Sequence, residues 1–273
     1  MNQKKGTDIY LEYVPILKKW HIALAINSYQ LLIFALVMIS FWWISSNFLL
    51  GPIYFQIIVS FLAILPFAYV TKKADKLRKK YREKYGNLAF QHMDLWILIY
   101  TVPLGAASLY FPILLKTDYF LPSIINLKQH FITTNIFPYY SAIPIGIILI
   151  IIGVKIRKPS GGFDYDIDSY IYLIFPEKSR KVEGGIYRYI RHPRYLGRFF
   201  LVMGIGALAN NIIALIVAFI HFLSYFFLIW VEDNELIDRF GESFRKHKKE
   251  VPALIPKYGN WRKFIKLVFT GKD

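Results

Sequence analysis

The chain has 273 residues, of which 55% are hydrophobic, and it contains no cysteine. The lack of cysteine excludes disulfides, thiolate metal sites, iron–sulfur clusters and cysteine nucleophiles. A formal net charge of +16 would suggest a nucleic-acid partner in a soluble protein, but here the cationic residues gather between long uncharged stretches. That pattern is typical of an integral membrane protein whose basic loops meet lipid headgroups, so we expect a membrane and no nucleic acid as partner.

The uncharged stretches predict membrane-spanning helices, because about 20 apolar residues in a helix cross the hydrocarbon core. Five stretches have about that length: Ile22–Ile44, Phe48–Val70, Leu95–Leu115, Ile136–Val154 and Ile212–Val231. A shorter stretch, Leu196–Ala209, contains Arg198 and is followed by Asn210-Asn211, which predicts a tight turn. The short stretch and the last span therefore predict a short C-terminal helical hairpin within the membrane.

The distribution of lysine and arginine predicts the orientation of the chain. Loops on one side hold 31 of the 34 cationic residues, whereas the loops on the other side hold only Lys116 and Lys128. By the positive-inside rule, this asymmetry predicts about six crossings with both termini in the cytoplasm. We therefore predict an all-α, polytopic transmembrane bundle, with residues 1–273 as a single membrane domain and residues 1–155 as a four-span scaffold.

One motif is better explained by helix packing than by chemistry. Residues 204–209 match the dinucleotide fingerprint G-x-G-x-x-A, but no strand precedes them and they lie in an apolar span. Small residues in such a span predict close packing of helices. The histidines are scattered along the chain, so we predict no metal site.

Polar residues concentrate in two segments that the hairpin should bring together. Counting away from the Asn-Asn turn places Arg191-His192 at about the depth of Glu232, although Pro193 makes this register approximate. On the last helix, one face carries His221, Tyr225, Leu228, Glu232, Glu235 and Arg239. A purely structural reading is that Arg191 pairs with Glu232, and Glu235 with Arg239, to hold the hairpin.

The two segments together resemble one superfamily of membrane enzymes. The motif residues are Arg191-His192-Pro193-x-Tyr195-x-Gly197, then Glu232-Asp233, Phe240-Gly241 and Val251-Pro252 to Ile255-Pro256. This combination resembles the isoprenylcysteine carboxyl methyltransferases and the phospholipid N-methyltransferases. The resemblance identifies residues 184–256 as a methyltransferase-like cofactor-binding region. The family usually has two adjacent glutamates, whereas this chain has Glu232-Asp233.

The resemblance implies an S-adenosylmethionine-dependent methyltransferase acting on a lipid-like acceptor, either a phospholipid amine or a prenylcysteine carboxylate. The implied cofactor-binding residues are Tyr187, Arg191, His192, Tyr195, Gly197, Glu232 and Glu235. Among these, Arg191, His192 and Glu232 are the expected catalytic residues. A carboxylate such as Glu232 suits the ribose diol or the ammonium group of this cofactor, and Arg191 or His192 suits its carboxylate.

Two other classes of protein stay open from the sequence. Membrane sterol reductases end in a similar R-H-x-x-Y-x-G and V-P-x-x-I-P pattern, and they use NADPH. A non-catalytic membrane scaffold that retains the motifs is the other alternative. Binding of S-adenosylmethionine or of NADPH would discriminate between them.

Overall fold

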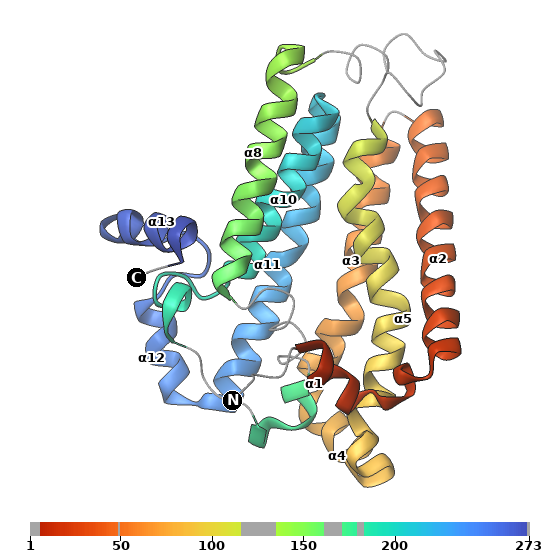
Figure 1. Ribbon diagram of the computed structural model, residues 1–273, viewed down its shortest axis with the longest axis vertical. Coiled ribbons are helices and arrows are strands. Elements are labelled where there is room, and N and C mark those ends of the chain that lie inside the picture. Colours follow the sequence, from red (N-terminus) through yellow and green to blue (C-terminus); the bar gives the residue numbers. More distant parts are fainter. Residues whose placement is uncertain (1–5, 49, 116–134, 161–170, 179–182, 272–273) are drawn as a thin grey trace.

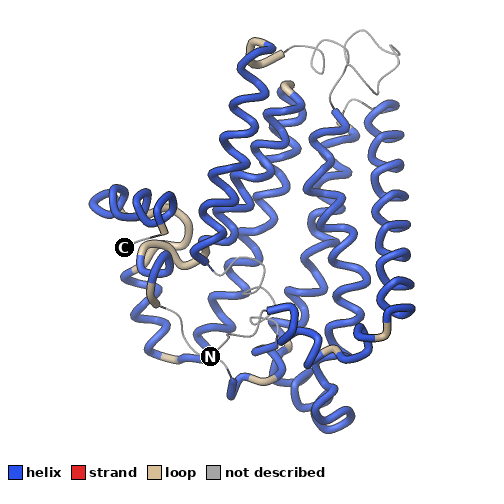
Figure 2. The backbone as a smooth tube through the Cα atoms, viewed as in Figure 1, coloured by secondary structure: helices blue, strands red, loops and turns tan. Residues whose placement is uncertain are grey.

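The computed structural model describes residues 6–48, 50–115, 135–160, 171–178 and 183–271, which form helices and loops without any strand (Figure 2). The helices are α1 (Gly6–Tyr13), α2 (Trp20–Asn47), α3 (Gly51–Lys72), α4 (Ala74–Tyr85), α5 (Ala89–Tyr110), α8 (Tyr139–Arg157), α10 (Pro193–Ala209), α11 (Ile212–Phe240), α12 (Glu242–Glu250) and α13 (Trp261–Thr270). The predicted all-α fold is confirmed. Lys116 and Lys128 lie outside the described residues.

Five helical segments are long and apolar enough to cross a membrane: α2, α3, the run from α4 through α5, α8 and α11. The sixth predicted crossing is α10, which has 17 residues and runs beside α8 and α11 (Figure 1). Large apolar side chains cover the outer surface of the bundle; Leu31, for example, is 67% exposed. Hydrocarbon is the solvent that suits such a surface, so the protein is an integral membrane protein.

The long helices form two groups that α11 joins (Figure 1). One group contains α2, α3 and α5, and the other contains α8, α10 and α11. α11 packs against both α3 and α10, whereas α8 packs mainly against α10. α4 and α12 lie at one end of the bundle, where α11 also ends (Figure 1). The two motif segments of the sequence meet at this end.

Glycines let α8 and α10 approach each other very closely. A Cβ atom added to Gly204 would lie 2.7 Å from the carbonyl oxygen of Gly146, and one added to Gly153 would lie 2.6 Å from that of Gly197. A side chain at these positions would have to push the two backbones apart. The small residues around Gly204 therefore serve helix packing, as the sequence predicts.

The predicted turn between α10 and α11 is built by two asparagines. Asn210 adopts a left-handed conformation with a φ of 59°, which asparagine tolerates better than most residues. Asn211 caps α11, since its side-chain oxygen accepts a hydrogen bond from the amide of Ala214 at 2.8 Å. Asn210 also bonds both backbone groups of Phe137, so the turn fixes the chain that leads into α8.

Candidate functional site

The segment before α10 is held by backbone hydrogen bonds to the segment after α12. The amide of Arg191 donates to the carbonyl of Pro252, and the amide of His192 donates to the carbonyl of Ala253, both at 2.9 Å. Pro193 has no amide hydrogen and starts α10, so the polar pair lies just outside the helix. This pairing explains why the R-H-P and V-P motifs belong to one site.

Arg191 forms a buried ion pair with Asp233 and does not pair with Glu232. Its Nη2 atom lies 2.9 Å from Asp233 Oδ2, and its Nη1 atom donates to the carbonyls of Lys248 and Val251. Asp233 is 3% exposed and also lies 3.2 Å from Lys248 Nζ. The predicted pair of Arg191 with Glu232 is therefore wrong, because the carboxylate of the next residue, Asp233, points toward the guanidinium of Arg191. Arg191 ties α10, α11 and the end of α12 together.

His192 lies between the two adjacent carboxylates of α11. Its Nε2 atom is hydrogen-bonded to Asp233 Oδ1 at 2.9 Å, and its Nδ1 atom lies 3.5 Å from Glu232 Oε2. Burial by itself lowers the pKa of an imidazole, but hydrogen bonds to Asp233 and Glu232, and the negative charges of both, raise the pKa of His192. Because carboxylates only accept hydrogen bonds, this position favours the doubly protonated ring.

Glu232 is the more accessible of the two carboxylates. Tyr195 donates its hydroxyl hydrogen to Glu232 Oε2 at 2.7 Å, and Arg194 Nη2 lies 3.8 Å from Oε1. The side chain of Glu232 is 18% exposed, compared with 4% for that of Asp233. One carboxylate of the pair thus faces a pocket, whereas the other is enclosed by cations.

The predicted pair of Glu235 and Arg239 is confirmed. Arg239 Nε donates to Glu235 Oε1 at 2.8 Å, and a second contact joins Arg239 Nη2 to Glu235 Oε2. The two residues are four positions apart on α11, so they lie on one face of the helix. Glu235 lies about one turn beyond Glu232 and Arg239 about two turns, toward the end of the bundle.

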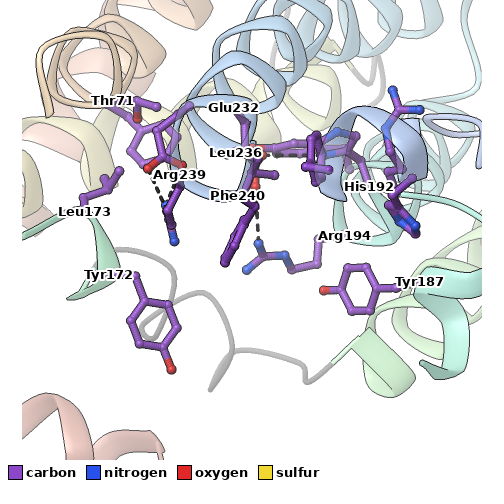
Figure 3. A pocket seen from close by; sticks show the side chains of 16 residues that line it. Thr71, Tyr172, Leu173, Tyr187, His192, Arg194, Glu232, Leu236, Arg239 and Phe240 are labelled. Carbon is purple, nitrogen blue, oxygen red and sulfur yellow. Dashed lines mark hydrogen bonds and ion pairs between the residues drawn. The ribbon is translucent and has the colours of Figure 1, made fainter. Parts of the chain in front are cut away.

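The two motif segments line a single pocket (Figure 3). Its lining residues are Phe67, Thr71, Tyr172, Leu173, Tyr187, Arg191, His192, Arg194, Tyr195, Glu232, Glu235, Leu236, Arg239, Phe240, Phe244 and His247. Tyr187 and His192 lie on one side, Thr71 and Leu173 on the other, with Phe240 between them (Figure 3). The first side is mostly polar and comes from the R-H-P segment, whereas the second includes apolar side chains of α3 and α11.

Six of the seven residues predicted for the cofactor line this pocket, and Gly197 does not. A Cβ atom on Gly197 would lie 2.5 Å from Cγ of Arg157 and 2.8 Å from the carbonyl oxygen of Gly153. Gly197 therefore faces α8, away from the pocket. Arg194 and Arg239, which the sequence did not single out for the cofactor, do line it.

Two residues that line the pocket carry buried polar atoms without a hydrogen-bond partner among the described residues: Arg191 Nε and Thr71 Oγ1. Buried polar groups in proteins are nearly always satisfied, so such atoms mark places where a bound molecule can contribute. Arg191 is cationic, Thr71 is neutral and Glu232 is anionic. The pocket therefore contains hydrogen-bond donors and acceptors together with charges of both signs. This set fits a cofactor that carries an ammonium group, a carboxylate and hydroxyls.

Comparisons with known proteins agree on the nature of the C-terminal part. Residues 141–243 match the family model described as phospholipid methyltransferase. The Protein-S-isoprenylcysteine O-methyltransferase of Xenopus laevis is 30% identical over 51% of this chain and 50% of its own length. The Protein-S-isoprenylcysteine O-methyltransferase A of Arabidopsis thaliana is 27% identical over 62% of this chain and 89% of its own.

A third relative is named for a different acceptor. Methanethiol S-methyltransferase 1 of Bradyrhizobium diazoefficiens is 35% identical over 29% of this chain and 26% of its own length. This chain spans half of the length of the Xenopus laevis relative and less than half of the length of several other relatives. No solved structure matches it significantly. This chain is thus similar to the phospholipid methyltransferase family over residues 141–243, and to isoprenylcysteine O-methyltransferases over about half of its length or more.

Proposed function

We propose that this protein is an integral membrane methyltransferase that uses S-adenosylmethionine and acts on a lipid-like acceptor. The observation that carries the proposal is the pocket lined by His192 and Glu232, two residues within the range that matches a phospholipid methyltransferase family model. The matched family model and relatives are methyltransferases, so we do not propose an NADPH-dependent sterol reductase or a non-catalytic scaffold.

The polar side of the pocket suits the cofactor. Glu232 would accept hydrogen bonds from its hydroxyls or its ammonium group, and Tyr187 and Arg194 would contact its other polar groups. Arg191 and His192 line the same side and give it positive charge for the carboxylate of the cofactor. When bound, S-adenosylmethionine supplies an activated methyl group.

The other side of the pocket suits the acceptor. Phe67 and Thr71 come from the end of α3, a membrane-spanning helix, and Leu236 and Phe240 come from α11. An acceptor with an apolar chain could lie along these helices and place its reacting group near Glu232. Thr71 Oγ1 would then donate or accept one hydrogen bond to the polar end of that acceptor.

The residues of the site contribute mainly by positioning, because methyl transfer is an in-line displacement between two aligned groups. A prenylcysteine carboxylate is already a nucleophile and needs no base. A phospholipid ammonium group must first lose a proton to a base. The walls of α3 and α11 would keep water away from the reacting atoms.

The cofactor proposal is tested by calorimetric titration of S-adenosylmethionine into the purified protein in lipid nanodiscs. We expect Glu232→Gln to weaken binding at least about tenfold, since it removes the charge that faces the pocket. Glu242→Gln is the matched control, because Glu242 is exposed on α12, outside the pocket lining, and undergoes the same chemical change. Equal affinities for both variants would contradict the assignment of Glu232.

The acceptor is tested with tritiated S-adenosylmethionine and membranes that contain the protein. Three acceptors are supplied separately: phosphatidylethanolamine, S-farnesylcysteine and, because two relatives are named for it, methanethiol. The proposal expects label in the lipid or in the prenylcysteine ester. Label in neither of them above empty-vector membranes would contradict the lipid-like acceptor, and label in the volatile product alone would replace it.

We also propose that the pocket and both termini face the cytoplasm. The support is that the basic helices α4 and α12 lie at the pocket end of the bundle (Figure 1). Because the chain lacks cysteine, the variant Lys257→Cys has a single exposed thiol at this end. A charged, impermeant maleimide should label it only after cells are permeabilised. Labelling of intact cells would reverse the orientation.

A further inference from the structure

The C-terminal helix α13 is fastened to the segment that carries the R-H-P motif. Its residues Phe264, Leu267 and Val268 are each 5% exposed or less. They form one cluster with Ile186, Tyr189, Ile190 and Ile156. The rings of Tyr189 and Phe264 meet edge to face, with centroids 6.3 Å apart. One face of α13 therefore packs against the turn at Gly185–Arg188 and stabilises it. This turn includes Tyr187, which lines the pocket.

A second apolar face of α13 is only partly covered by the described residues. Trp261, Ile265 and Phe269 are 41%, 48% and 51% exposed. They are spaced four residues apart, so they form one stripe along the helix. Three large apolar side chains on a ten-residue helix are too many to leave in water without a partner.

All charged residues on the polar face of α13 are cationic. Arg262, Lys263 and Lys266 are exposed, and α13 has no acidic residue. An apolar stripe beside a basic face is the pattern of helices that lie in the membrane interface. The cations of such a helix meet lipid phosphates while its apolar side chains enter the outer part of the bilayer.

The position of α13 fits the same interface. It lies across the direction of the spanning helices, beside the lower part of α8 (Figure 1). Its buried face contacts Ile156, close to the basic end of α8 at Lys155 and Arg157. The exposed apolar residues Ile151 and Val154 of α8 lie within about one turn of that end. α13 is thus packed on α8 near the end of the exposed apolar surface of that helix.

We propose that α13 is an in-plane membrane anchor, whose stripe of Trp261, Ile265 and Phe269 inserts into the headgroup layer and whose cations contact lipid phosphates. The occupant of the exposed stripe is the bilayer of the protein's own membrane. Since the adjacent, buried face of α13 packs on the segment of residues 186–190, the anchor holds one wall of the pocket at the membrane surface.

The natural absence of cysteine makes the test direct. Ile265→Cys places a thiol on the stripe, and Lys263→Cys places one on the cationic face; both positions are exposed in the structure. Phe269→Cys and Thr270→Cys form a second pair in case one variant misfolds. Each variant is purified, placed in nanodiscs of phosphatidylcholine and phosphatidylglycerol, and treated with a charged maleimide. In parallel, a fluorescent label on each thiol is exposed to lipids with a spin label near the headgroup.

We expect the stripe thiols to react at least about tenfold more slowly than their paired controls, and only their labels to be quenched by the spin-labelled lipid. Equal reaction rates after denaturation in detergent would show that the thiols themselves are comparable. Equal rates in nanodiscs would overturn the proposal, because both faces would then be in water. Slow reaction without quenching would also overturn it, because protein and not lipid would then cover the stripe.

Discussion

Replacing Asp233 by asparagine should destabilise the protein strongly while leaving the pocket lining chemically intact. Asp233 is 3% exposed and has cationic partners at 2.9 Å (Arg191), 2.9 Å (His192) and 3.2 Å (Lys248). Removing one partner of a buried ion pair costs roughly 3–5 kcal/mol, and asparagine keeps the shape, so we expect about 3 kcal/mol. In a chain of this size, that loss corresponds to a melting temperature lower by about 6–12 °C.

The assay follows tryptophan fluorescence during heating in nanodiscs, together with calorimetric titration of S-adenosylmethionine well below the transition. Glu232→Gln is the comparison, because Glu232 lines the pocket and its side chain is 18% exposed, whereas that of Asp233 is 4% exposed. We expect Asp233→Asn to lower the melting temperature mainly, and Glu232→Gln to lower affinity mainly. A variant Asp233→Asn that melts like the wild type but no longer binds cofactor would refute the assignment of Asp233 to the structural frame.

Two further predictions concern His192 and the contact of α8 with α10. The folded pKa of His192 is raised, so its contribution to stability is complete below its ordinary pKa and is lost as the pH rises through the folded value. The wild-type melting temperature should therefore fall from about pH 6 to about pH 9, whereas His192→Gln should flatten this slope; parallel slopes would rule the explanation out. Gly204→Ala should cost about 1–3 kcal/mol, since the new Cβ would meet the Gly146 carbonyl. Gly105→Ala, with nothing within 4 Å of its Cβ, should be neutral or stabilising, and a similar melting temperature for the two variants would contradict the packing argument.

The sequence predicted the spans and the hairpin because the bilayer imposes a simple rule on composition. Uncharged stretches of about 20 residues are long enough to cross it, and basic residues gather between them. The turn at Asn210-Asn211 was equally readable, since asparagine both tolerates the left-handed conformation and caps helices. The meeting of His192 with Glu232 followed from counting residues away from that turn.

The partner of Arg191 could not be predicted from the sequence, for a geometric reason. Adjacent residues on a helix point about 100° apart, so Glu232 and Asp233 face different neighbours. Which of them faces Arg191 depends on the register of the segment before Pro193, which the proline interrupts. Gly197 shows the same difficulty. A glycine near a site can make room either for a ligand or for a neighbouring helix. At Gly197, the position of α8 shows that the glycine makes room for that helix.

The geometry divides the charged groups of the site into a fixed set and an exchangeable one. Arg191 and Asp233 are buried, lie 2.9 Å apart and are bonded further to the backbone of the segment after α11, so a cofactor could displace them only at a high cost. Arg194 and Glu232 lie 3.8 Å apart with side chains 17% and 18% exposed. At 3.8 Å, this contact is longer than the 2.9 Å ion pair of Arg191 with Asp233, so it is the weaker of the two and the easier to separate. If the proposed zwitterionic cofactor binds here, its charged groups would take the place of one partner for each member of this pair, so that no buried charge would be left unmatched.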